Sequence, residues 1–178
     1  HEDCRRQRQM CIRDRGLGHA ILTGEPLIGD QPFGVVLSDD LCLNREGPGV
    51  LAQMAALYEE HQCSIVAVQE VPGEEVDKYG VVAGTAERDG LTRVGEMVEK
   101  PSPEEAPTNL AVIGRYILTP DIFDIIRNTP PGKNGEVQLT DALQAQAREG
   151  RVMAYQFEGL RFDLSLIHIS EPTRQVLI

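Results

Sequence analysis

The alternation of strand and helix patterns early in the chain is the feature that most restricts its fold. Residues 33–37 form a short apolar run that ends at Asp39 and Asp40, as a buried strand ends in a polar turn. Residues 49–61 carry apolar side chains at helical spacing, and residues 64–71 return to a strand pattern. Such a strand–helix–strand unit favours an at least partly parallel sheet, whose ligands gather beyond the carboxyl ends of its strands.

The rest of the chain continues this alternation. The patterns of residues 79–83 and 91–100 indicate two strands. They are joined through Asp89 and Gly90, a turn signal that predicts a hairpin. Three prolines, at positions 101, 103 and 107, make the next stretch a loop. The remaining expected elements are a strand at 109–118, a helix capped by Thr119 with Pro120 in its first position, a helix at 140–149 stopped by Gly150, and a strand at 151–157.

Size and charge narrow the class of protein. A chain of 178 residues is long enough for one α/β domain with a core. Its 17 Lys and Arg residues against 28 Asp and Glu residues give a net charge of −11, which disfavours a nucleic-acid partner. The sequence has neither an apolar run long enough to span a membrane nor an apolar stretch near its start, so we expect a cytoplasmic protein. The four cysteines lack the spacing of a zinc or redox motif.

Both ends of the chain differ in character from its middle. Residues 1–15 mix charged and polar side chains without periodicity, and residues 164–178 fit no continuation of the preceding strand. We interpret both as non-native tails that, like fusion scars, are not part of the fold. Residues 16–163 are then a partial domain.

Several residues could carry chemistry, each with a structural alternative. Asp39 and Asp40 could bind Mg²⁺ or form a solvated turn. The glycine-rich helix start at residues 16–20 could let the backbone approach a nucleotide, or its glycines could simply form a turn before the helix. Glu99 and Lys100 could contact a sugar hydroxyl and a phosphate, or they could form an exposed pair. Taken singly, these patterns leave the function open.

Six segments in one order remove much of that ambiguity. They are residues 16–20 (GLGHA), 37–40 (LSDD), 79–82 (YGVV), 98–101 (VEKP), 109–116 (NLAVIGRY) and 135–142 (GEVQLTDA). Over residues 16–163 this order resembles the bacterial UTP–glucose-1-phosphate uridylyltransferases. The resemblance implies an α/β fold, the Rossmann-like nucleotide-diphosphosugar transferase fold, with a mixed, mostly parallel sheet, helices on both faces, and truncation at both ends.

The resemblance also implies roles for individual residues. Asp39 and Asp163 would bind the catalytic Mg²⁺, and Lys100 would contact phosphate. Gly16, Gly18 and His19 would lie along the uridine nucleotide. The glucose and phosphate pocket would be lined by Gly80, Glu99, Lys100 and Asn109, with Val112 as its adjacent wall. Glu136, Gln138 and Asp141 match the family without an assigned role, although Asp141 could cap its helix.

The implied reaction is an in-line attack of the glucose 1-phosphate oxygen on the α-phosphorus of UTP, which gives UDP-glucose and pyrophosphate. The family usually forms homo-oligomers. This chain departs from the family in lacking a glycine-rich basic loop before residue 16 and in carrying Ser38 for a proline and Leu164-Ser165 for Cys-Gly. We therefore expect the parent protein to be an enzyme and this chain to be inactive or barely active. The alternatives are a glucose-1-phosphate thymidylyltransferase, a noncatalytic sugar-nucleotide-binding module, and a fragment that does not fold stably because a sheet edge is exposed.

Overall fold

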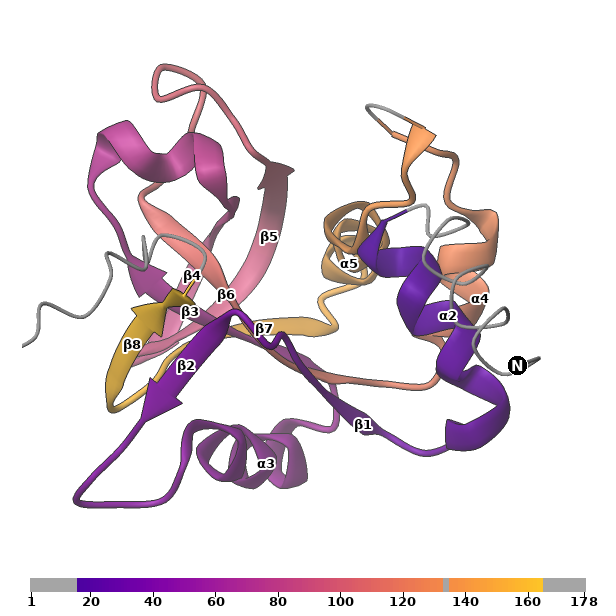
Figure 1. Cartoon of the computed structure of the whole chain (residues 1–178), viewed down its shortest axis with the longest axis horizontal. Coiled ribbons are helices and arrows are strands. Elements are labelled where there is room, and N and C mark those ends of the chain that lie inside the picture. Colours follow the sequence, from indigo (N-terminus) through magenta and orange to yellow (C-terminus); the bar gives the residue numbers. More distant parts are fainter. Residues whose placement is uncertain (1–15, 133–134, 165–178) are drawn as a thin grey trace, which may run out of the picture.

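A six-stranded mixed sheet forms the centre of the computed structural model, which describes residues 16–132 and 135–164 (Figure 1). Residues 1–15 and 165–178 of the expected tails lie outside the described residues. In spatial order the strands are β1 (Phe33–Val36), β6 (Leu110–Leu118), β3 (Ser64–Glu70), β7 (Val152–Gln156), β5 (Leu91–Glu99) and β4 (Gly80–Arg88). The predicted hairpin is confirmed, since β4 and β5 pair antiparallel and Gly90 takes a positive φ of 71° in the turn between them.

The expectation of a mostly parallel sheet is wrong. Among the described strand pairings, β3 with β7 is parallel and all the others are antiparallel. Strands β1 and β3 do point the same way, as the strand–helix–strand pattern predicts, but β6 lies between them and runs antiparallel to both. Strand β6 can occupy the middle because it has apolar side chains on both faces, whereas β1 alternates half-buried and exposed residues. The apolar run at residues 33–37 is therefore not a fully buried strand.

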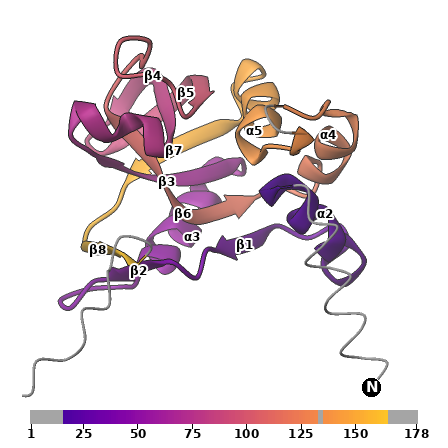
Figure 2. The ribbon, with the colours of Figure 1, turned by 45° about the horizontal axis from the view of Figure 1, so that its top comes forward.

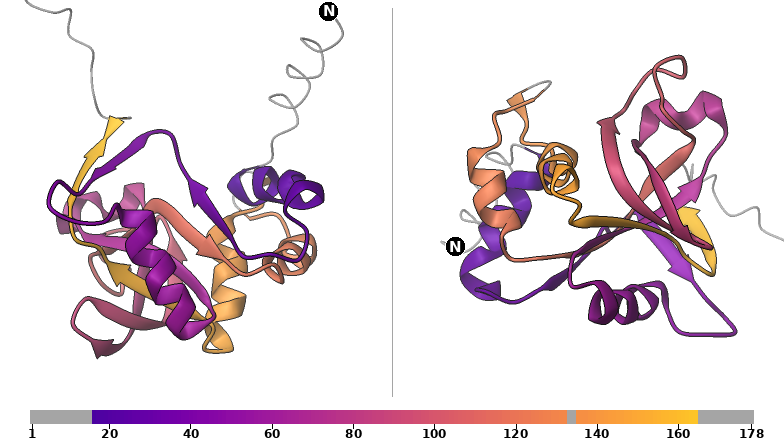
Figure 3. Two further views of the ribbon diagram at one scale, coloured as in Figure 1. Left: turned by 90° about the horizontal axis from the view of Figure 1, so that it is seen from below. Right: turned by 180° about the vertical axis from the view of Figure 1, so that it is seen from behind.

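Helices cover both faces of the sheet, as expected. Helix α3 (Val50–His61) lies alone on one face, while α2 (Leu17–Ile28), α4 (Ile122–Asn128) and α5 (Leu139–Arg148) pack together on the other (Figures 2 and 3). Each face of the sheet has its own hydrophobic core. Successive residues of β3 pack into one core and then the other, because side chains alternate across a strand. Ile65 and Ala67 pack towards α3, and Val66 and Val68 pack with the three-helix side. No helix in residues 16–132 and 135–164 is both long and apolar enough to cross a membrane.

Two helix starts differ from the sequence expectation. Helix α4 begins at Ile122 rather than directly after Thr119, and Asp121 precedes it without a side-chain capping bond. The Asp121 carboxylate instead accepts bonds from Gln146 and Arg151, which compete successfully for it. Helix α5 begins one residue earlier than expected, so Asp141 lies inside its first turn and is not a cap. The stop at Gly150 is confirmed by its positive φ of 71°.

A second, two-stranded sheet was not expected from the sequence. Strand β2 (Asp40–Leu43) pairs antiparallel with β8 (Leu160–Asp163), which places Asp40 opposite Asp163. Each strand has only four residues, and their alternating patterns are too short to separate from loop by periodicity. This β2–β8 ribbon joins two aspartates that are 123 positions apart in the sequence.

Candidate functional site

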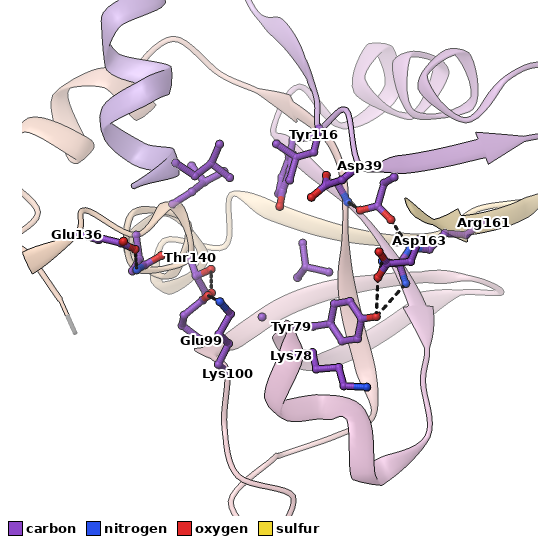
Figure 4. Close-up of a pocket in the computed structure, with 18 residues that line it drawn as sticks. Asp39, Lys78, Tyr79, Glu99, Lys100, Tyr116, Glu136, Thr140, Arg161 and Asp163 are labelled. Carbon is purple, nitrogen blue, oxygen red and sulfur yellow. Dashed lines mark hydrogen bonds and ion pairs between the residues drawn. The ribbon is translucent and has the colours of Figure 1, made fainter. Parts of the chain in front are cut away.

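A cavity of about 500 Å³ lies where the ends of several elements meet, between the β2–β8 ribbon, the β4–β5 hairpin and the start of α5 (Figure 4). Figure 4 shows Asp39, Tyr79, Arg161 and Asp163 along one side and Glu99, Lys100, Glu136 and Thr140 along the other. The lining residues are Leu17, Leu37, Asp39, Asp40, Lys78, Tyr79, Gly80, Glu99, Lys100, Val112, Gly114, Tyr116, Glu136, Gln138, Leu139, Thr140, Arg161 and Asp163.

The cavity brings together six of the ten residues to which the family resemblance assigns a role. Asp39, Gly80, Glu99, Lys100, Val112 and Asp163 all line it. Gly16, Gly18, His19 and Asn109 are not among the lining residues, although Leu17 is. Asn109 is exposed, and its backbone carbonyl accepts a bond from the amide of Val71. The structure therefore brings six of the predicted residues to one cavity, and the sugar, metal and nucleotide roles stay predictions.

The two adjacent aspartates have different roles in the structure. Asp40 is buried, and its carboxylate accepts bonds from the amide of Gly114, at 3.0 Å, and from the guanidinium of Arg161. Asp39 is exposed at the cavity, and no hydrogen bond or ion pair of its carboxylate occurs among the residues that the structure describes. Asp40 therefore holds the fold together, and Asp39 remains available to a ligand.

Arg161 is a central residue of the site that the sequence did not reveal. Its side chain is only 9% exposed, and it bridges Asp40 to Asp163, with 2.9 Å between Nη2 and the Asp163 Oδ2. The same Oδ2 accepts the Tyr79 hydroxyl at 3.0 Å, and the Arg161 guanidinium lies 5.0 Å from the centre of the Tyr79 ring. Burial alone would lower the pKa of Arg161, but its bonds to Asp40 and Tyr79 outweigh that effect and raise it. Arg161 therefore keeps its positive charge, next to the two carboxylates that it bridges.

The opposite wall carries the residues predicted to bind sugar and phosphate. Thr140 donates its hydroxyl to Glu99 Oε2 at 2.6 Å, so this threonine orients the carboxylate instead of capping α5. Gly80 lies beside them, since a Cβ there would stand 3.3 Å from both Glu99 Oε2 and Thr140 Oγ1. Lys100 takes a positive φ of 46°, unusual for a residue with a side chain; its side chain is 61% exposed, and its Nζ lies 4.0 Å from Glu99 Oε1. The ammonium group is thus exposed at the cavity, beside the Glu99 carboxylate.

The glycine-rich start of α2 packs against the segment before α5. The Gly18 amide donates to the Val137 carbonyl at 3.0 Å, and a Cβ on Gly18 would lie 2.7 Å from that oxygen. Gly16 has a φ of 99°, where glycine is strongly favoured, and also lies against residues 136–137. Close backbone packing thus accounts for both glycines, and a nucleotide role for Gly16, Gly18 and His19 stays a prediction.

Tyr116 is a second lining residue that the sequence left without a role. It lies on the same face of β6 as Val112 and Gly114, and it is 7% exposed. Burial is the main cause of a raised pKa for its hydroxyl, and the negative charges of Glu99, Asp40 and Asp39 add to it. Tyr116 therefore stays neutral and can donate a hydrogen bond into the cavity.

The side chains of Asp39 and Asp163, which the sequence predicts to bind Mg²⁺, both line the cavity. Mg²⁺ is typically held by one or two carboxylates together with substrate phosphates, and these two side chains present carboxylate oxygens on one wall that could serve as such ligands. No group of three or more His, Cys, Asp or Glu side chains suited to a metal occurs within the described ranges. The donor set therefore suits a cation shared with a ligand better than a closed protein cage.

These features, an α/β domain with a carboxylate-lined cavity at the strand ends, agree with the comparison to known families. The profile of the nucleotidyl transferase family matches residues 4–162. The chain belongs to this family. Enzymes of the family generally use a divalent metal ion.

Individual relatives narrow the comparison. The chain is 67% identical over 152 residues to a UTP–glucose-1-phosphate uridylyltransferase of Pseudomonas aeruginosa, a match that covers 85% of this chain and 54% of the relative. It superposes on a UDP-glucose pyrophosphorylase complexed with UDP-glucose with a TM-score of 0.84 and 59% identity, over 85% of this chain and 58% of the other. A UTP-bound UGPase from Acinetobacter baumannii gives a TM-score of 0.73 at 36% identity, over 84% and 51%. The chain thus spans about half the length of these relatives.

Proposed function

We propose that the protein to which this chain belongs transfers a uridylyl group from UTP to glucose 1-phosphate, which gives UDP-glucose and pyrophosphate. The observation that carries the proposal is the convergence of Asp39, Asp163, Glu99 and Lys100 on one cavity of about 500 Å³. Its volume suits a small-molecule ligand. The printed names of relatives that are 67% and 59% identical agree with this substrate class.

Each wall of the cavity has a distinct part in the proposed reaction. Lys100 binds a phosphate oxygen and offsets negative charge as the phosphorus is attacked. Glu99, oriented by Thr140, accepts hydrogen bonds from sugar hydroxyls and so fixes the direction of the attacking phosphate. Asp39 and Asp163 would hold Mg²⁺, which neutralises charge on the phosphates when it is bound. The reaction needs no covalent enzyme intermediate, because positioning and charge neutralisation suffice.

Two other readings remain as rivals. A glucose-1-phosphate thymidylyltransferase would use the same phosphate and sugar groups with another base, and a noncatalytic module would bind a sugar nucleotide without turnover. The proximity to relatives named for UTP and UDP-glucose favours the uridylyl reading. For the whole protein we further propose a cytoplasmic homo-oligomer, which sedimentation of the full-length protein would test.

Calorimetric titration of the 178-residue chain separates these readings. We expect UDP-glucose to bind more tightly than dTDP-glucose, and we expect Mg²⁺ to strengthen the binding. Asp39→Asn should abolish the Mg²⁺ effect, whereas Asp124→Asn, at a carboxylate that is 81% exposed and outside the cavity, should not. Tighter binding of dTDP-glucose would favour the thymidylyl rival, equal affinity would remove the support for the uridylyl enzyme over it, and no binding of either would refute the assignment of the cavity. Formation of UDP-glucose from UTP and glucose 1-phosphate, assayed on the full-length protein, distinguishes an enzyme from a binding module.

A further inference from the structure

The turn that carries Asp39 is fixed by its backbone. Three of its carbonyl groups have donors: Arg115 binds those of Leu37 and Asp40, and the amide of Leu164 donates to that of Asp39 at 2.7 Å. The Leu37 amide in turn donates to the Gly114 carbonyl at 2.9 Å. The turn is therefore held from β6 and from the end of β8, although the Asp39 side chain itself is exposed.

Arg115 reaches this turn from the face of β6 opposite to the cavity. It alternates along β6 with Gly114 and Tyr116, which line the cavity, and Arg115 itself does not line it. Its Nη1 donates to the Leu37 carbonyl at 3.0 Å and to the Gly114 carbonyl at 2.7 Å, and its Nη2 donates to the Asp40 carbonyl. One planar guanidinium thus spans both ends of the turn, a geometry that a single ammonium cannot reproduce.

Gly114 makes this close approach possible. A Cβ on Gly114 would lie 2.7 Å from the Leu37 Cβ and 2.8 Å from Asp40 Oδ2, so a larger residue would push the turn away from β6. With glycine there, the Gly114 amide binds the Asp40 carboxylate at 3.0 Å. Gly114 and Arg115 are neighbours in sequence, and together they bind the turn from two sides.

We propose that Arg115 is a positioning residue, which holds the turn at residues 37–40 so that the Asp39 carboxylate is in place before a cation arrives. The inference rests on the proposed function, because it takes Asp39 as a cation ligand. Arg115 acts through the backbone and touches neither cation nor substrate. Groups that orient metal ligands from outside the coordination sphere commonly change metal affinity by roughly 10–100-fold when they are removed.

The test uses the whole 178-residue chain and measures separately how well the turn is held and how tightly a cation binds. In Arg115→Met, amide hydrogen exchange by NMR should become at least about tenfold faster at Leu37 and Leu164, while Ile65, in the centre of the sheet, keeps its rate. The affinity for Mn²⁺, measured by electron paramagnetic resonance, should fall roughly 10–100-fold. Binding of UDP-glucose in the presence of a chelator should stay within about twofold, because loss of the turn leaves Glu99 and Lys100 in place.

Two variants serve as controls. Arg115→Lys keeps the charge but not the two-ended contact, so it should restore only part of the Mn²⁺ affinity. Arg88→Met removes an exposed guanidinium that makes two bonds to Glu60, and it should change neither the amide exchange rates nor the Mn²⁺ affinity.

Different results would contradict the role of Arg115 and the proposed function. Unchanged exchange at Leu37 and Leu164 in Arg115→Met would overturn the role of Arg115, and so would faster exchange with unchanged Mn²⁺ affinity. Full rescue by Arg115→Lys would overturn it as well, because charge alone would then be enough. If Asp39→Asn leaves the Mn²⁺ affinity of the chain unaltered, the assignment of Asp39 to the cation fails, and the proposed function loses its metal site.

Discussion

Two cavities of similar volume differ in how their charged residues are held. The candidate site, of about 500 Å³, is lined by residues from both ends of the described chain and contains the buried pair Asp40 and Arg161. The other, of about 530 Å³, is a groove between α4 and α5, and its lining residues are Asp124, Ile125, Asn128, Thr129, Pro130, Asp141, Gln144, Ala145 and Arg148. Its charged residues, Asp124, Asp141 and Arg148, are all exposed.

The difference shows why volume alone does not identify a functional site. Charges buried in a protein lose hydration, and they persist where partners and hydrogen bonds compensate them. In the candidate site, such partners and hydrogen bonds surround carboxylates that face a cavity. Ionisable groups whose pKa values are shifted by such surroundings are common at functional sites. The α4–α5 groove has no buried, compensated charge of this kind among its lining residues. Changes at the first cavity should therefore have large effects, and matched changes at the second should have small ones.

The largest expected difference in stability is between two arginines. Arg161→Met removes the partner of buried Asp40 and should lower the free energy of unfolding by about 3–5 kcal/mol. Arg148→Met, in the α4–α5 groove, should change it by less than about 0.5 kcal/mol. Urea unfolding followed by circular dichroism measures both.

The double variant Arg161→Met with Asp40→Asn provides the control for this comparison. It removes the uncompensated charge, so it should regain part of the stability lost in Arg161→Met. Similar losses for Arg161→Met and Arg148→Met would remove the contrast between the two cavities.

A pair of glycines in α2 gives the next largest effect. An alanine Cβ at Gly18 would lie 2.7 Å from the Val137 carbonyl, next to the cavity, and should destabilise the protein by about 1–3 kcal/mol. At Gly24, on the same helix, the nearest heavy atom would be 3.4 Å away, so Gly24→Ala should stabilise it by roughly 0.5–1 kcal/mol. Thermal unfolding of the two variants should shift the midpoint in opposite directions, and shifts of the same sign would contradict the close packing at Gly18.

A binding measurement extends the comparison from stability to ligands. Lys100→Met removes an exposed ammonium from the cavity, so it should weaken UDP-glucose binding by about tenfold, or ~1.4 kcal/mol, with little change in stability. Arg148→Met removes a cation from the groove and should leave the affinity unchanged. Calorimetry at two salt concentrations checks this, since the contribution of Lys100 should fall as salt rises. Equal affinities of the two variants would argue against phosphate binding by Lys100.

The parts of this molecule that the sequence predicted are those with strong local signals. The spacing of apolar residues located α3, β3, the β4–β5 hairpin and β6, because each buries a face with its own period. Resemblance to a family placed Asp39, Glu99, Lys100 and Asp163 in one site, and the cavity contains all four.

The missed parts depend on partners that are distant in the sequence. The insertion of β6 between β1 and β3 is decided by pairing between strands about 80 residues apart, which no local pattern encodes. The roles of Arg115 and Arg161 follow from the same long-range contacts: Arg115 binds carbonyls of residues 37 and 40, and Arg161 binds a carboxylate across the unexpected β2–β8 ribbon. A basic residue in a strand pattern carries no mark of such a partner.

The smallest expected effect concerns acid stability on the α4–α5 side of the molecule. Burial alone would raise the pKa of Asp121, but hydrogen bonds from Thr119, Gln146 and Arg151 outweigh it and lower the pKa in the folded protein. A carboxyl group whose pKa is lower when folded stabilises the protein above its unfolded pKa, near 3.9, and that contribution is lost as the pH falls through the folded pKa. Because the side chain is 39% exposed, solvent screening should keep the effect below about 1 kcal/mol.

Urea midpoints measured between pH 7 and pH 2.5 test this contribution. The stability of Asp121→Asn should depend less on pH below about pH 4 than that of the unmodified chain. Arg151→Met, which removes the donor at 2.6 Å, should flatten the same part of the curve without removing the carboxyl group. If both variants keep the full acid dependence, the acid sensitivity arises elsewhere, and the polar contacts of Asp121 on this side of the molecule are as weakly coupled to stability as the exposed charges of the groove.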